Sequence, residues 1–107
     1  MHTQPYSNNG IIVDPTVVKN GDQLKIVYDG LLAKSGAEHI YVRIGEGSKF
    51  YNEQDVRMEK TGENRFQAEC YVQPTSETVN FCFKDCANNW DNNNGKNYVL
   101  TTPYQNQ

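Results

Sequence analysis

Residues 88–98 read NNWDNNNGKNY, which places the single tryptophan of the chain, Trp90, among asparagines, an aspartate, a glycine and a lysine. Tryptophans of a protein core usually lie in apolar segments, where their large area is buried. Asn and Asp side chains instead cap turns, and an Asn-Gly pair such as Asn94-Gly95 favours left-handed backbone. We therefore predict a turn, with Trp90 either folded down as its lid or displayed to a partner.

A displayed Trp90 suits the chemistry of a sugar. A sugar ring presents a face of C–H groups to an aromatic plane, while its hydroxyls need fixed amide and carboxylate partners. Asp91, Asn92 and Asn93 follow the indole directly and are of the right types. Such a site needs a second aromatic platform, and the polar loop at 46–54 carries two candidates, Phe50 and Tyr51. The sequence leaves open which of the two serves.

Residues for catalysis or for binding metals and phosphates are sparse. The two histidines, His2 and His39, are isolated, so neither a metal cluster nor a Ser-His-Asp arrangement is indicated. The fragment at 45–48, GEGS, lacks the third glycine and the following helix of a dinucleotide-binding loop. We expect no enzyme activity, no metal and no cofactor.

The three cysteines, Cys70, Cys82 and Cys86, form an odd set without a Cys-x-x-Cys pair. Neither a disulfide framework nor a zinc site is indicated. We expect three free thiols, with a bridge between Cys82 and Cys86 across a turn as the alternative.

Length and charge limit the class of protein. The 107 residues suit one domain, and the net charge of -3 argues against nucleic-acid and anionic-membrane partners, which require a basic surface. No run of residues reaches the roughly 20 apolar positions of a membrane span, and the first residues lack the pattern of a signal peptide. The expected location is cytoplasmic if the chain is full length, and extracellular if it is an excised module.

Apolar residues recur with period two, and turn residues interrupt them about every ten positions. This pattern predicts an all-β, immunoglobulin-like sandwich of about seven antiparallel strands. The expected strands are 11–13, 24–30, 40–45, 55–60, 65–72, 78–85 and 98–102. We expect a flexible N-terminal arm at 1–10, a single domain at 11–102 and a C-terminal tail at 103–107.

Alternation along the expected strands predicts which side chains face the core. Ile40, Val42 and Ile44 point inward, so Tyr41 and Arg43 point outward, because successive side chains of a strand lie on opposite faces. By the same reasoning Cys82 lies on the face opposite to its phenylalanine neighbours.

Several motifs together resemble a known family. The segments GDQLKIVYDGLL, GAEHIYVRIGEG and GENRF are followed by VNFCFKDCANNWDNNNGKNY, in which Trp-Asp-Asn-Asn-x-Gly-x-Asn-Tyr is the specific part. This combination resembles the starch-binding carbohydrate-binding modules of families twenty-five and fifty-three, over nearly the whole chain.

The resemblance implies a non-catalytic module that binds α-1,4-linked glucose in starch, glycogen or maltooligosaccharides. It implies that Trp90 stacks on a glucose ring, that Asn92 and Asn93 bond to the sugar or shape the loop, and that Phe50 or Tyr51 is the second platform. Arg43 stands where the family often has a histidine or an aromatic residue. A catalytic domain in a longer parent chain is a further expected partner. The expected affinity is modest, about 1 mM to 1 μM.

Two rival functions are also considered. The outward residues Tyr41, Arg43 and Tyr71 are of types that favour binding hot spots, which predicts a protein–protein interaction domain as the alternative. A glycan-active enzyme would need two carboxylates that flank the sugar, and the acidic residues show no such arrangement in the sequence.

Overall fold

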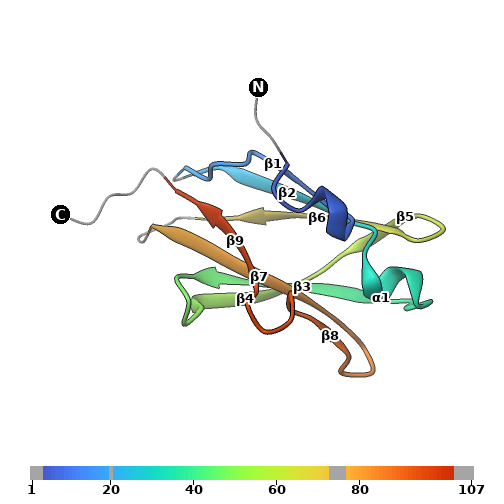
Figure 1. Cartoon of the computed structure of the whole chain (residues 1–107). Helices are drawn as coiled ribbons and strands as arrows, with labels where there is room; N and C mark the ends of the chain where they lie inside the picture. Colours follow the sequence, from blue (N-terminus) through green and yellow to red (C-terminus); the bar gives the residue numbers. More distant parts are fainter. Residues whose placement is uncertain (1–3, 20, 73–76, 103–107) are drawn as a thin grey trace.

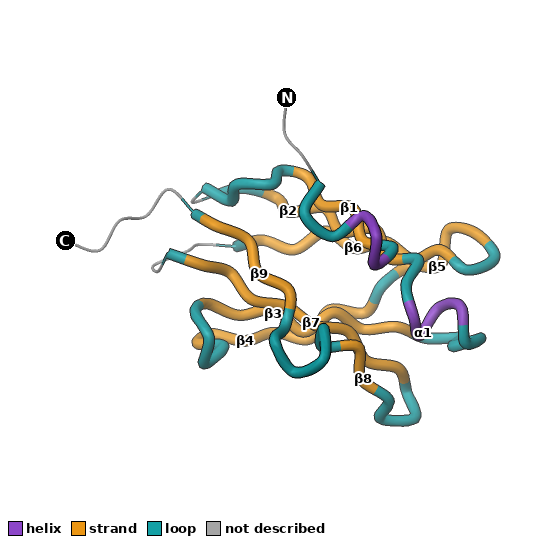
Figure 2. Tube along the Cα trace, viewed as in Figure 1, coloured by secondary structure: helices purple, strands orange, loops and turns teal. Residues whose placement is uncertain are grey.

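The chain folds into two antiparallel β-sheets packed face to face (Figures 1 and 2). The computed structural model describes residues 4–19, 21–72 and 77–102. The elements in chain order are η1 (Ser7–Asn9), β1 (Ile11–Asp14), β2 (Gln23–Tyr28), α1 (Leu31–Lys34), β3 (Ile40–Glu46), β4 (Tyr51–Arg57), β5 (Glu59–Gly62), β6 (Arg65–Tyr71), β7 (Thr78–Asp85), β8 (Trp90–Asp91) and β9 (Tyr98–Thr101). One sheet has the order β1-β2-β6-β5, and the other has β4-β3-β7 with both β8 and β9 paired to β7.

The predicted all-β sandwich is confirmed, but the described residues form nine strands instead of about seven. The strand expected at 55–60 is two strands, because the chain leaves β4 at Arg57 and enters the opposite sheet as β5 at Glu59. Between them Met58 is buried, and its amide donates to the Ile40 carbonyl oxygen at 2.8 Å. The other additional strand is β8, inside the stretch predicted to be a turn.

The core lies between the two sheets and is filled by their inward side chains. The predicted inward residues of β3, Ile40, Val42 and Ile44, are buried. Aromatic rings form the centre of this core: Tyr28 of β2 stacks on Phe83 of β7 with ring centroids 4.0 Å apart. Such rings contribute the largest buried areas per residue, so contacts between the sheets hold the sandwich together.

Part of the segment expected to be a flexible arm lies against the sandwich. Tyr6 packs edge-on against Tyr98 with centroids 4.9 Å apart, and its hydroxyl accepts a hydrogen bond from the Val99 amide at 2.9 Å. The Gln4 side chain makes two hydrogen bonds to the backbone of Val13: Nε2 donates to the carbonyl oxygen, and Oε1 accepts from the amide. Residues 1–3 and the expected tail at 103–107 lie outside the described residues.

All three cysteines are free, as the sequence predicts. Cys82 faces away from the core, since it alternates with Phe81 and Phe83, yet it is only 5% exposed. Burial raises the pKa of the Cys70 and Cys82 thiols to about 11 each. Both thiols are therefore protonated and unreactive near neutral pH.

Candidate functional site

The asparagine-rich stretch interrupts a single edge of the second sheet. Along one side β7 pairs with β3, and along the other it pairs first with β9 and then with β8. Residues 92–97 leave the sheet between these two short strands (Figure 1). The loop therefore projects from the sheet edge at the level of Cys82, between the pairs Phe81–Tyr98 and Phe83–Asp91.

The backbone of this loop explains its asparagines. Asn93, Asn94 and Asn97 have φ angles of 55°, 57° and 61°, a left-handed conformation that Asn tolerates better than most residues. The loop is closed by the Asn97 amide, which donates to the Asn92 carbonyl oxygen at 2.7 Å, and by Asn93 Nδ2, which donates to the Asn97 carbonyl oxygen at 3.0 Å. Asn92 Oδ1 accepts from the Gly95 amide. The loop is thus built largely by its own amides.

Trp90 and Asp91 lie on opposite faces of the sheet. The sequence predicted a turn here, but both residues belong to β8, where side chains alternate. Trp90 faces solvent on the outer face and is 39% exposed, whereas Asp91 faces the core and is 8% exposed. Trp90 is therefore displayed on the surface instead of closing the core.

The Asp91 carboxylate is held between two buried tyrosines. The Tyr28 hydroxyl donates to Oδ2 at 2.6 Å, and the Tyr98 hydroxyl donates to Oδ1 at 2.7 Å. Tyr28 also accepts from the Leu32 amide of α1 at 3.0 Å. Burial, followed by the neighbouring carboxylate, raises the pKa of both tyrosines far above the ordinary value, so they remain hydrogen-bond donors. This cluster joins β8 and β9 to the opposite sheet.

The outer face around Trp90 is set by strand register. Trp90 lies opposite Lys84 of β7, which lies opposite Tyr41 of β3. Arg43 lies two residues further along β3, where it is paired with Asp55 of β4. The structure thus brings Trp90 and Arg43, both predicted from the sequence, together with Lys84 and Asp55, which sequence reasoning missed. The proximity of Lys84 and Asp55 to Trp90 depends on which residues of neighbouring strands are paired, and the sequence of a single strand does not show this pairing.

Two cations lie against the Trp90 ring. Arg43 Cζ is 4.9 Å and Lys84 Nζ is 5.5 Å from the ring centroid, distances at which cations are attracted to the indole. Arg43 donates to both oxygens of Asp55, from Nε at 2.7 Å and from Nη2 at 3.0 Å. Lys84 Nζ is 3.4 Å from Asp55 Oδ2. The hydrogen bond from Arg43 lowers the pKa of Asp55, which keeps this carboxyl ionised at neutral pH.

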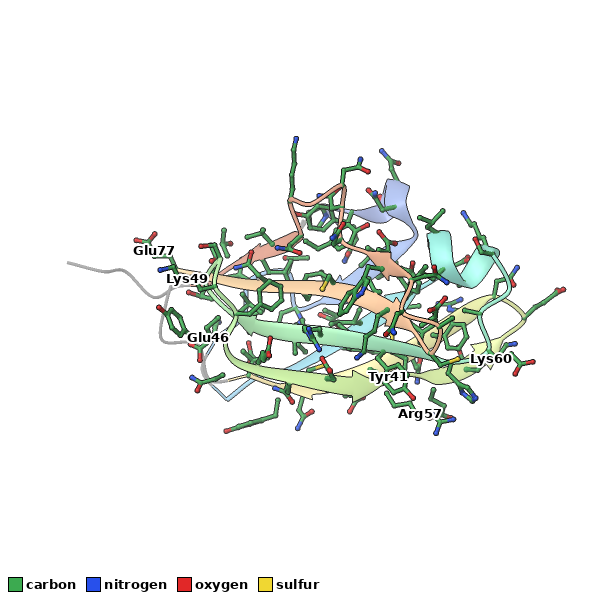
Figure 3. The ribbon with its side chains drawn as sticks, turned by 90° about the horizontal axis from the view of Figure 1, so that it is seen from below. Tyr41, Glu46, Lys49, Arg57, Lys60 and Glu77 are labelled. Carbon is green, nitrogen blue, oxygen red and sulfur yellow. The ribbon has the colours of Figure 1, made fainter. Side chains whose placement is uncertain are left out.

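The two candidates for the second platform have different surroundings. Phe50 is half-buried, and its backbone passes so close to Gly45 that a Cβ at that position would be 2.7 Å from Phe50 Cα. Tyr51 begins β4 opposite Glu46 and is 63% exposed. Glu46 and Tyr41 lie toward opposite ends of β3, as Figure 3 shows. Because Trp90 lies in the row of Tyr41, Tyr51 and Trp90 lie toward opposite ends of this sheet.

The residues of the alternative protein-binding patch are divided between the sheets. Tyr41 and Arg43 share the outer face of β3, but Tyr71 belongs to β6 in the other sheet. Among residues 4–19, 21–72 and 77–102, no group of three or more potential metal ligands is close enough to hold an ion. Within the same ranges no helix has the length and apolar character needed to cross a bilayer.

Comparison with known proteins agrees with the resemblance read from the sequence. Residues 24–81 match the family model described as a starch/carbohydrate-binding module, family 53, a span that includes Arg43 and Tyr51 but ends before Trp90. An α-amylase of Clostridium acetobutylicum is 30% identical over 98 residues, which are 92% of this chain and 12% of the amylase. No solved structure matches the chain in the corresponding search. Since the family model covers more than half of the sequence, the chain belongs to the starch/carbohydrate-binding modules of family 53.

Proposed function

We propose that the chain is a non-catalytic module that binds α-1,4-glucans, such as starch, glycogen and maltooligosaccharides, on the outer face of the sheet formed by β4, β3, β7 and β8. The observation that carries this proposal is the Trp90 indole, which is exposed on that face beside the internally hydrogen-bonded amide loop at 92–97. Membership of a starch-binding family supports the ligand class. The C. acetobutylicum relative is an α-amylase of which this chain matches 12%, which supports a catalytic domain in a longer parent chain.

The polar contacts of the proposed site come from the residues around the indole. Asn92 and Asn93, both half-buried, hold the loop beside Trp90 and are suited to bond to sugar hydroxyls. Arg43 has five N–H donors and uses two of them on Asp55, so donors remain for a ligand. Asp91 has a different role in this proposal: its buried carboxylate holds β8 in place and does not contact sugar.

Two carboxylates of the site, Asp55 and Asp91, support a non-catalytic function. Glycoside hydrolysis generally uses two carboxyl groups that flank the glycosidic bond, one of them a protonated acid with a raised pKa. Asp55 is paired with Arg43 and its pKa is lowered, while Asp91 is enclosed by two tyrosine hydroxyls. Neither group has the surroundings of a catalytic acid.

The single tryptophan provides a direct test of this function. Titration with maltoheptaose is expected to change the intrinsic fluorescence of Trp90 and to saturate with a Kd of about 1 mM to 1 μM. Titration with cellohexaose is expected to leave it unchanged, since a β-linked glucan follows a flat path. An unchanged signal with both sugars, together with no retention on starch, would contradict the proposal.

We further propose that Tyr51, not Phe50, is the second platform, because its ring is exposed while Phe50 anchors the turn against Gly45. Since Tyr51 and Trp90 lie toward opposite ends of the sheet, the two rings would contact different glucose units of one long chain. Tyr51→Ala is expected to weaken maltoheptaose binding about tenfold, the effect of a typical hot-spot residue, with little change in Tm. Calorimetric titration measures the change. Tyr71→Ala, which removes an exposed tyrosine from the other sheet, is the matched control. Normal binding by Tyr51→Ala and loss of binding by a folded Phe50→Ala would assign the platform to Phe50.

A further inference from the structure

We propose that Asp55 is a positioning residue for glucan binding: it fixes Arg43 against one side of the Trp90 indole, so that the ring is held in one orientation with its other side available to a sugar. The inference deepens the proposed function and rests on it. Neither the sequence motifs nor the family match gives Asp55 a role of this kind.

The two cations that contact Trp90 lie on the same side of its ring. Arg43 and Lys84 both contact the Asp55 carboxylate, with Arg43 Nη2 and Lys84 Nζ at 3.0 Å and 3.4 Å from the same oxygen, Oδ2. Cations centred over opposite faces of an indole, at the observed 4.9 Å and 5.5 Å from its centre, would be too far apart to share one oxygen, and both cations come from β3 and β7, which lie on the same side of β8. The cations therefore cover one side of the ring. The solvent-exposed surface of Trp90 is the surface that they leave uncovered.

The geometry of the Asp55–Arg43 pair is suited to holding the Arg43 guanidinium in one orientation beside the indole. Two parallel hydrogen bonds hold the planar guanidinium at a fixed angle, and a planar guanidinium can stack on an aromatic face. The paired side chains are 31% and 35% exposed, and pairs this open to solvent contribute little to folding stability. The expected result of breaking the pair is therefore a more mobile indole on an intact fold.

A fixed indole strengthens binding because less side-chain freedom is lost when the sugar arrives. Loss of the Asp55 contact is expected to weaken maltoheptaose binding by about 2- to 10-fold, the range set by the ordering of one side chain. Asp55→Asn keeps Arg43 in the protein, so it separates the positioning role of the pair from direct contact between Arg43 and the sugar.

The test measures binding and the mobility of Trp90 in the same proteins. For the wild type, Asp55→Asn and Arg43→Lys, maltoheptaose affinity is measured by calorimetry, and Trp90 mobility by fluorescence anisotropy and acrylamide quenching without sugar. Both variants are expected to bind more weakly, with lower anisotropy and stronger quenching, and Asp55→Glu is expected to restore part of each signal. Glu53→Gln is the matched control, since it removes one charge two residues away on the same strand.

Each outcome decides between the roles. Weaker binding with unchanged anisotropy and quenching would overturn the positioning role and make the pair a direct sugar contact. A more mobile indole with unchanged affinity would overturn the link between ring orientation and binding, and no change in either quantity would overturn both. If the wild type itself fails to bind maltoheptaose, the proposed function fails, and the mobility measurements still show whether Asp55 orients the ring.

Discussion

Trp90→Ala is expected to weaken maltoheptaose and starch binding at least about 30-fold while the protein stays folded. The indole is the largest aromatic surface beside the amide loop, and a residue at the centre of a binding site contributes at least about 2 kcal/mol, which is about 30-fold in affinity. A Kd near 1 mM would then lie beyond measurement, and a Kd near 1 μM would rise to about 30 μM. Calorimetric titration and retention on insoluble starch measure the effect, and far-ultraviolet circular dichroism measures the fold.

The control for Trp90→Ala is Ile12→Ala. Ile12 is an exposed apolar residue of β1 in the other sheet, 41% exposed compared with 39% for Trp90. Its substitution removes a similar kind of surface from a different face and is expected to leave binding unchanged. Wild-type affinity in Trp90→Ala would rule out the indole as the platform, and loss of the folded spectrum would show that Trp90 serves the fold.

Asp91→Ala, a change at the next residue, is expected to lower the free energy of unfolding by about 3 to 5 kcal/mol. The substitution removes two hydrogen bonds to a charged acceptor and leaves the buried O–H groups of Tyr28 and Tyr98 without the acceptor of their protons. A domain of this size is stable by only about 5 to 15 kcal/mol, so the loss is a large share of the total. Urea unfolding followed by circular dichroism measures the shift in midpoint.

Two further variants test the explanation for Asp91. Glu69→Ala removes an exposed carboxylate from β6 and is expected to change the unfolding free energy by less than about 0.5 kcal/mol. Adding Tyr98→Phe to Asp91→Ala is expected to recover about 1 kcal/mol or more, since it removes one hydroxyl left unsatisfied. A stability near that of the wild type in Asp91→Ala would show that the carboxylate does not hold β8 to the opposite sheet.

The pattern within single strands could be predicted from the sequence. The predicted inward set Ile40, Val42 and Ile44 is confirmed, because alternation depends only on the local geometry of a strand. The number of strands was wrong for a related reason. Val56 and Met58 are two residues apart, as inward residues of one continuous strand would be, yet the chain passes from one sheet to the other between β4 and β5. Alternation does not indicate which sheet a segment joins.

Part of the candidate site could also be recognised in advance. Residue type alone indicated Trp90 as a platform, and its exposure agrees with display to a partner. The placement of Asp91 could not be predicted, since its partners Tyr28 and Tyr98 are 63 and 7 residues away along the chain. From their polar neighbours in the sequence, Trp90 and Asp91 were both expected to contact the ligand at the surface. In the fold, Asp91 points into the core instead.

The amino-acid sequence by itself determined the all-β class, the inward and outward faces of its strands, and the motif around Trp90 that led to the family. Only the tertiary structure decided which residues surround the indole. Asp55, Arg43 and Lys84 come from three strands, and their contacts follow from pairing register. Register brings together residues distant in sequence and is set by the packing of the whole sheet, so no local pattern encodes it.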